Sequence, residues 1–222
     1  MNQTKQSLVL RFLLRLCAGI TFVIIAGLII YILCMGLPHI TPSLFALHYS
    51  SDNASLFPAL VNTVIVLILS LVLAVPVGVG AAVYLAEYAK RGNKFVRVIR
   101  ITAETLSGIP SIVYGLFGYL LFVTALKWQF SLLAGCFTLA IMILPVIMRT
   151  SEEALLSVPD MYREASFGLG AGKLRTVFKI VLPAAIPGII NGIVLSVGRI
   201  IGETAALLYT AGTVAHIPSS LM

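Results

Sequence analysis

Five long apolar segments with almost no charged residues dominate this sequence of 222 residues. They run over Leu16–Leu37, Pro58–Ala86, Leu106–Leu126, Phe130–Met148 and Pro183–Ala211. Each segment is long enough to cross the hydrocarbon core of a bilayer, which is about 30 Å thick. Backbone polar groups in lipid must be satisfied internally, and these runs lack the alternation of a strand, so we expect helices. The sequence therefore predicts an all-α membrane protein with five visible spans.

The composition agrees with a membrane protein. Hydrophobic residues make up 59% of the chain and charged residues 10%, whereas a soluble domain carries about 25% charged residues. The formal charge of +7 is compatible with nucleic-acid binding, but the basic residues are spread between the apolar segments and form no patch. We therefore expect the lipid bilayer as a partner and no nucleic acid.

Basic residues are distributed unevenly among the polar connections. With a cytoplasmic N-terminus, only Lys127 is left in an outside turn. This is the distribution that the positive-inside rule describes, so it predicts that the N-terminus is cytoplasmic. Five spans would leave the C-terminus outside, and we therefore expect that a sixth span is missing from this sequence. The inside segments hold Lys5, Arg11, Arg15, Lys90, Arg91, Lys94, Arg97, Arg100, Arg149, Arg163, Lys173, Arg175 and Lys179.

The longest polar segment, residues 149–183, contains a pattern with defined spacing. Glu164-Ala165-Ser166 is followed by three residues, then by Gly170, and after nine further residues by IVLP at positions 180–183. The pattern predicts a short helix that ends at glycine-rich turns on the cytoplasmic face of the membrane. Ala165 and Ser166 are small, so we expect them to permit the close approach of a partner.

This spacing resembles the EAA loop of ABC importer permeases, whose pattern is E-A-A-x3-G-x9-I-x-L-P, with Ser166 as the single departure. The resemblance implies a type I ABC-importer transmembrane domain with a MetI-like fold. It also implies that Glu164, Ala165, Ser166 and Gly170 couple the spans to an ATPase subunit. On this interpretation residues 1–57 hold the cytoplasmic tail, the first span and an outer loop. Residues 58–222 form the permease core, which includes the coupling loop 149–183 and lacks the last span.

The glycine-rich residues 168–173 are similar to an ATP-binding phosphate loop but lack two of its required residues. Phe167 stands where the first glycine is needed, and Leu174 replaces the serine or threonine. We therefore expect that this chain binds no cofactor and that ATP is used by a partner ATPase. The sequence contains no nucleophile–base constellation and no metal-ligand spacing, so we predict that the chain is not an enzyme.

The fifth apolar segment contains two charged residues, Arg199 and Glu203. Their spacing of four residues would place them on one helix face, where they could pair directly. One interpretation is a structural salt bridge that holds the bundle together. The other is that Arg199 offers its donors to an oxyanion while Glu203 holds the guanidinium in place. Two glycine pairs with the same spacing, Gly188 with Gly192 and Gly198 with Gly202, would each allow a neighbouring helix to approach closely.

Two segments resemble phosphate permeases of the ABC importer class. Residues 198–205 (GRIIGETA) match their signature G-R-x-x-G-E-T-A, and residues 105–118 (TLSGIPSIVYGLFG) match a second segment of theirs. Ala205 favours the A-type over the C-type permease.

For Arg149, a topology anchor that extends to the membrane surface is an alternative to a functional role. The candidate residues that follow are Arg199, Glu203, Thr204 and Arg149 in the substrate path, and Glu104, Ser107, Ser111, Glu152 and Glu153 at an inner gate.

The resemblance implies a permease subunit of an ATP-driven importer of inorganic phosphate in a bacterial inner membrane. Its implied partners are a C-type phosphate permease subunit in a heterodimer, two ATP-binding cassette subunits and an external phosphate-binding protein. Two alternatives stay open. The cargo could be another oxyanion, such as sulfate or molybdate, or another small solute, or the chain could mainly signal phosphate status.

Overall fold

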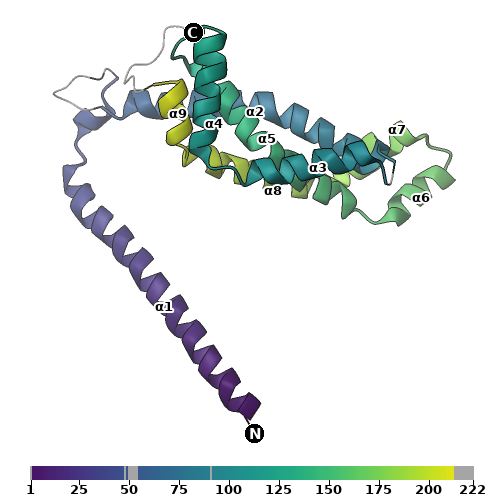
Figure 1. The fold of residues 1–222 in the computed structure, drawn as a ribbon, viewed down its shortest axis with the longest axis horizontal. Coiled ribbons are helices and arrows are strands. Elements are labelled where there is room, and N and C mark those ends of the chain that lie inside the picture. Colours follow the sequence, from purple (N-terminus) through teal and green to yellow (C-terminus); the bar gives the residue numbers. More distant parts are fainter. Residues whose placement is uncertain (1, 48, 50–54, 91, 213–222) are drawn as a thin grey trace. The chain divides into compact units, whose positions relative to one another are not determined.

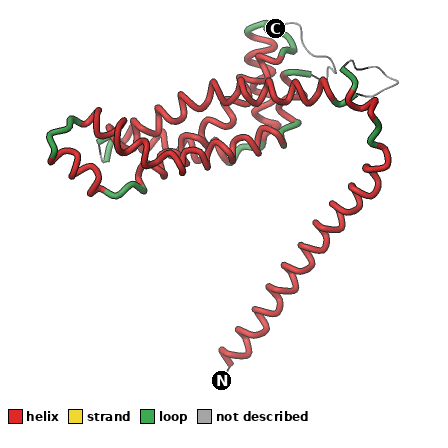
Figure 2. The backbone as a smooth tube through the Cα atoms, turned by 180° about the vertical axis from the view of Figure 1, so that it is seen from behind, coloured by secondary structure: helices red, strands yellow, loops and turns green. Residues whose placement is uncertain are grey.

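Helices follow one another along the described part of the chain (Figures 1 and 2). The computed structural model describes residues 2–47, 49, 55–90 and 92–212, and the chain divides into two units, Met1–Phe57 and Pro58–Met222. In the first unit, α1 spans Asn2–Gly36 and two short 3-10 turns follow at Leu37–His39 and Pro42–Phe45. Its apolar stretch is long enough to cross a membrane.

The second unit is a bundle in which α2, α3, α5 and α8 lie roughly parallel (Figure 1). α4 and α9 lie at one end of this bundle, and α6 and α7 lie at the other. The elements are α2 (Phe57–Val83) with a π-helical turn (Tyr84–Tyr88), α3 (Lys94–Ser107), α4 (Ser111–Gly118) with a second π-helical turn (Tyr119–Ala125), α5 (Leu132–Leu156), α6 (Asp160–Gly168), α7 (Lys173–Thr176) with a third (Val177–Val181), α8 (Leu182–Ile201) and α9 (Ala205–Thr210).

α5 is the central helix of the bundle and packs against α3, α4, α8 and α9. It begins where the Ser131 hydroxyl accepts a hydrogen bond from the backbone N–H of Ala134 at 3.3 Å, which caps the helix N-terminus. Its side chains Met142, Ile143 and Ile147 are fully buried. The core of the bundle therefore lies along α5.

The predicted span Leu106–Leu126 corresponds to α4 and the π-helical turn after it, but the chain bends by 103° between α3 and α4, near the start of that segment. Pro110 disfavours helical backbone at the residue before it, so α3 ends at Ser107 and a new helix begins at Ser111. The Tyr114 hydroxyl donates a hydrogen bond to the Leu106 carbonyl at 2.8 Å and satisfies one acceptor at the end of α3. Among the described residues, four helices are long and apolar enough to cross a membrane, and the bent pair would make a fifth span.

The predicted last span, Pro183–Ala211, is also interrupted. α8 ends at Ile201, and α9 starts at Ala205 after a short break. The Glu203 side chain accepts a hydrogen bond from the backbone N–H of Ala206 at 2.9 Å, so it satisfies a donor at the start of α9. The expectation of a missing sixth span concerns a region outside the described residues.

Candidate functional site

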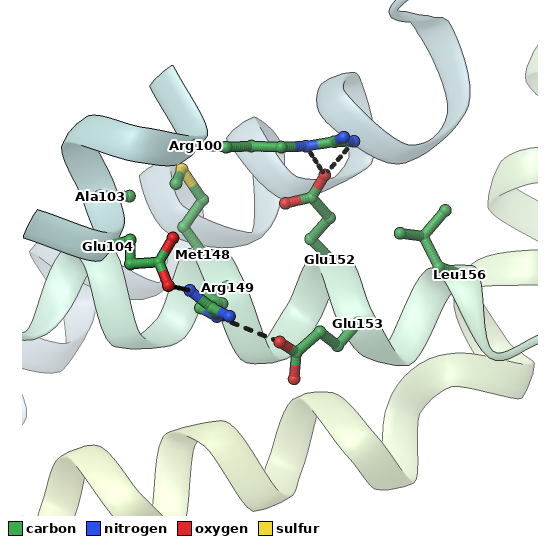
Figure 3. Close-up of a pocket in the computed structure, with 8 residues that line it drawn as sticks. All are labelled: Arg100, Ala103, Glu104, Met148, Arg149, Glu152, Glu153 and Leu156. Carbon is green, nitrogen blue, oxygen red and sulfur yellow. Dashed lines mark hydrogen bonds and ion pairs between the residues drawn. The ribbon is translucent and has the colours of Figure 1, made fainter. Parts of the chain in front are cut away.

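A cluster of charged side chains lines a pocket between α3 and α5 (Figure 3). The pocket has a volume of about 260 Å³ and extends to Leu156, the last residue of α5, after which the chain continues to α6. From α3 it is lined by Arg100, Ala103 and Glu104, and from α5 by Met148, Arg149, Glu152, Glu153 and Leu156. Two cations and three carboxylates therefore face one another across two helices.

Arg149 lies between two carboxylates, one from each helix (Figure 3). Its Nη1 is 3.3 Å from Glu104 Oε1 on α3, and its Nε donates to Glu153 Oε1 on its own helix at 3.1 Å. All three side chains are about half exposed or more. Solvent screens ion pairs as exposed as these, so they contribute little to stability and this contact between α3 and α5 is easily broken.

The second ion pair of the pocket is more strongly held. Arg100 Nε on α3 donates to Glu152 Oε1 on α5 at 2.8 Å, and Arg100 Nη2 lies 2.6 Å from the same oxygen in an ion pair. The Glu152 side chain is only 9% exposed, whereas that of Arg100 is 48% exposed. A buried carboxylate needs a partner, so this pair fixes the register of α3 on α5.

The structure brings three of the predicted gate residues together with Arg149. Glu104 and Glu153 contact Arg149, as described above, while Glu152 pairs with Arg100, which the sequence did not single out. Arg100 precedes Glu104 by four residues on α3. This spacing places both on one helix face, so it could have identified Arg100 as a neighbour of the predicted gate residue. Ser107 and Ser111 are not among the lining residues and flank the bend between α3 and α4. The gating role of these residues stays a prediction.

Arg199 is half-buried near the end of α8 and makes no ion pair with any described residue. The predicted Arg199–Glu203 pair is therefore not formed. The reason is that α8 ends before Glu203, so the two residues do not share a helix face and the carboxylate caps α9. Tyr114 on α4 lies within electrostatic range of the guanidinium. Thr204 is exposed in the break between the helices.

The substrate-path residues predicted from the sequence are not all brought to one place. Arg149 belongs to the pocket between α3 and α5, and Arg199 is not among the residues that line it. No helix in the described part of this chain approaches Gly198, because none of its atoms lies within 4 Å of a methyl group placed there. The close approach occurs at Gly188 and Gly192, where added methyl groups would meet Ala154 and Thr150 of α5.

The segment with the Glu-Ala-Ser pattern forms α6 and the turn after it. Glu164 and Ala165 are exposed, and Gly170 adopts a positive φ of +81°, a conformation that favours glycine. Ser166 is only 3% exposed, and its hydroxyl forms a 2.8 Å hydrogen bond with the Thr176 hydroxyl. Within this chain the Ser166 side chain joins α6 to α7, and its predicted role in contact with an ATPase subunit stays a prediction.

The outer surface of this loop is unusually apolar for an exposed segment. Met161, Tyr162 and Phe167 of α6 are exposed, and Leu169 in the following turn is 89% exposed. Exposed apolar side chains gathered in this way are typical of a protein-binding surface. Within the residues described, no group of three or more histidine, cysteine or acidic side chains is arranged to hold a metal ion.

The sequence matches the family model described as "binding-protein-dependent transport system inner membrane component" over residues 74–220. It is 40% identical over 199 residues to the "probable ABC transporter permease protein YqgI" of Bacillus subtilis, which covers 89% of this chain and 67% of the relative. It is 44% identical over 156 residues to the "phosphate transport system permease protein PstA 1" of Mycobacterium tuberculosis, with coverage of 70% and 51%. With PstA of Haemophilus influenzae the identity is 35% over 206 residues, with coverage of 89% and 72%.

The chain thus spans about half to three quarters of the length of these relatives. Among solved structures it resembles inward-facing forms of the MetNI methionine ABC transporter. In one crystal form the TM-score is 0.55 at 26% identity, covering 68% of this chain and 70% of the other. In a second the TM-score is 0.53 at the same identity, covering 66% and 68%.

Proposed function

Since this chain belongs to the family of binding-protein-dependent transport system inner membrane components, we propose that it is a permease subunit of an ATP-driven importer of inorganic phosphate. The type I ABC-importer fold predicted from the sequence is confirmed by the structural likeness. The observation that carries the choice of cargo is the identity of 35–44% to chains named as phosphate transport permeases. The GRIIGETA segment at residues 198–205 supports the same cargo.

Arg199 is the residue in this chain best suited to meet phosphate. An arginine near the middle of a bilayer is costly unless it is paired or faces a water-filled path. Arg199 is half-buried and has no carboxylate partner among the described residues, so its donors are available to an anion. The guanidinium fork suits phosphate oxygens because it can donate two parallel hydrogen bonds.

The ion pairs between α3 and α5 suit a gate at the inner end of the path. The contact of Arg149 with Glu104 joins the two helices at an exposed position, so a small relative movement would open it at little cost. The contact of Arg100 with the buried Glu152 would keep the helices in register during that movement. The bend between α3 and α4 supports this arrangement, because it makes α3 a short rigid arm.

The remaining partners are proposed from the family and from the exposed surfaces. ATP-binding cassette subunits would bind the apolar surface of α6 around Glu164 and Ala165, and would hydrolyse the ATP. A C-type permease would cover exposed apolar side chains of α2 and α8, such as Val72 and Val194, and an external binding protein would deliver phosphate. We place the complex in a bacterial inner membrane with the N-terminus cytoplasmic, as the distribution of basic residues favours.

The test is uptake of radiolabelled phosphate into proteoliposomes that contain the complete importer, with sulfate and molybdate as competitors. Arg199→Gln should abolish uptake while the ATPase subunits still co-purify with the permease. The matched control is Lys127→Gln, which neutralises an exposed cation in a turn and should leave uptake unchanged. Normal uptake by the Arg199→Gln complex would remove Arg199 from the path, and competition by sulfate or molybdate at equal concentration would overturn the choice of phosphate.

A further inference from the structure

One arginine joins the start of α6 to the bundle. Arg163 lies in the first turns of α6, and its side chain is only 15% exposed although it belongs to the most polar loop of the chain. Its Nε and Nη2 both donate to Glu87 Oε1, at 3.1 and 2.6 Å. The Glu87 side chain is 8% exposed and lies in the π-helical turn that continues α2. The two residues are 76 positions apart in the sequence.

The remaining donors of Arg163 are also used. Nη1 donates to the Val158 carbonyl at 2.7 Å and to Asp160 Oδ1 at 3.1 Å, and Nη2 donates to the Leu155 carbonyl at 2.9 Å. A guanidinium has five N–H donors, and the five hydrogen bonds of Arg163 therefore account for all of them. Every donor has a partner, and all of these partners except the exposed Asp160 are part-buried, so the side chain has one orientation that satisfies its donors and no good alternative.

These hydrogen bonds connect three elements at one point. The Leu155 carbonyl lies in the last turn of α5 and that of Val158 just after it, Asp160 is the first residue of α6, and Glu87 lies in the π-helical turn that continues α2. The chain itself links α6 to α5 through residues 157–159, and on the other side to α8 through α7. The chain provides no short covalent connection of this kind between α6 and α2. The contact of Arg163 with Glu87 links them by means of a buried ion pair.

We propose that Arg163 is the positioning residue through which displacement of α6 reaches α2, with Glu87 as its partner. This inference rests on the proposed function, in which an ATPase subunit moves α6. Without the ion pair, α6 could still bind the ATPase, because Glu164, Ala165 and Leu169 lie on the exposed surface of the loop. Its movement would reach α5 and α8 through the chain and would no longer be transmitted directly to α2.

The experiment compares Arg163→Gln, Glu87→Gln and the double variant in the reconstituted importer. Two quantities are measured for each complex: phosphate taken up per ATP hydrolysed, and stimulation of ATP hydrolysis by the binding protein. Arg163→Gln should lower both at least tenfold while the ATPase subunits still co-purify. Because the two residues act through one contact, the double variant should be no worse than the worse single variant. Asp160→Asn removes only an exposed partner of Arg163 and should stay within twofold of the unaltered complex.

A merely structural role would reduce the amount of assembled complex and leave uptake per ATP unchanged in what remains. That result, or losses that multiply in the double variant, would overturn the proposal. If Arg163→Gln does not assemble, Arg163→Lys decides, because lysine keeps the charge but has only three donors. The lysine variant should then assemble and still lose most of the coupling, and full coupling would refute the proposal.

The two proposals can fail separately. If the unaltered complex takes up no phosphate although its ATPase is stimulated by the binding protein, the choice of cargo is wrong. The Arg163→Gln complex is then compared with the unaltered complex only by the stimulation of ATP hydrolysis by the binding protein. This stimulation must also be transmitted between the spans and α6. A tenfold loss of stimulation in Arg163→Gln would still support the inference, and normal stimulation would contradict it.

Discussion

The contact between α5 and α8 predicts a specific response to a single methyl group. A methyl group added at Gly188 on α8 would lie 2.5 Å from Cβ of Ala154 on α5. Non-bonded carbon atoms pack best at about 3.5–4.0 Å, so Gly188→Ala would force the helices apart by about 1 Å at this point. Overpacking of this kind costs roughly 1–3 kcal/mol of unfolding free energy.

The matched comparison uses a glycine on the same helix that faces open space. Gly198→Ala introduces the same methyl group with no atom of the chain's described part within 4 Å. Its only expected effect is a gain in helix propensity, which raises the free energy of unfolding by at most about 1 kcal/mol. Gly188→Ala should therefore be less stable than Gly198→Ala by about 1–3 kcal/mol. At roughly 2–4 °C per kcal/mol for a chain of this size, the apparent Tm of the two variants in detergent should differ by several degrees.

The double variant Gly188→Ala/Ala154→Gly tests the cause of this difference. It moves the methyl group from α5 to α8, so the nearest neighbour of the new Cβ becomes the Cα of residue 154 at 3.5 Å, an ordinary contact. Helix propensity is nearly unchanged, because each helix exchanges one alanine or glycine for the other. The double variant should recover most of the lost stability. If it is as unstable as Gly188→Ala alone, the two helices do not meet at these residues and the reasoning is wrong.

Two further changes test backbone strain and the buried ion pair. Gly170→Ala should destabilise the loop by about 1–2 kcal/mol, because φ is +81° at this residue. The control is Gly168→Ala, where φ is not positive and an added methyl group meets open space, so its apparent Tm in thermal unfolding should not change. Arg100→Gln should cost about 1–3 kcal/mol, because it leaves the buried Glu152 carboxylate without its partner, and the exposed Arg97→Gln on the same helix should change stability by less than about 0.5 kcal/mol. Equal apparent Tm values within either pair of variants would contradict that explanation.

The sequence was sufficient to predict the spans that are continuous helices. Hydropathy and charge depend on composition within a window, so the predicted segments at residues 16–37, 58–86 and 130–148 largely coincide with helices that the structure contains. The other two segments were also predicted as helical, but their interruptions were not, because these have local causes. Pro110 and the cap formed by Glu203 change the backbone over three or four residues without lowering the mean hydropathy of the segment.

The candidate site was predicted in part. Arg149, Glu104 and Glu153 could be grouped because two of them are four residues apart and the third follows from the resemblance. The pairing of Arg163 with Glu87 could not be predicted, since it joins residues 76 positions apart and depends on how α6 folds back on the bundle. The inward direction of Ser166 also depends on tertiary packing, because only the position of α7 brings Thr176 within reach.

The unequal burial of the spans sets how freely each can change during evolution. Within the most apolar stretch of α5, 61% of residues are buried inside the chain, against 22% for the corresponding stretch of α2. A lipid-facing position accepts almost any apolar side chain, whereas a position packed on all sides accepts only a narrow range of volumes. Among homologues, the positions of α2 that face lipid should therefore drift among leucine, isoleucine, valine and phenylalanine, while α5 should vary mainly through paired changes with the helices that surround it.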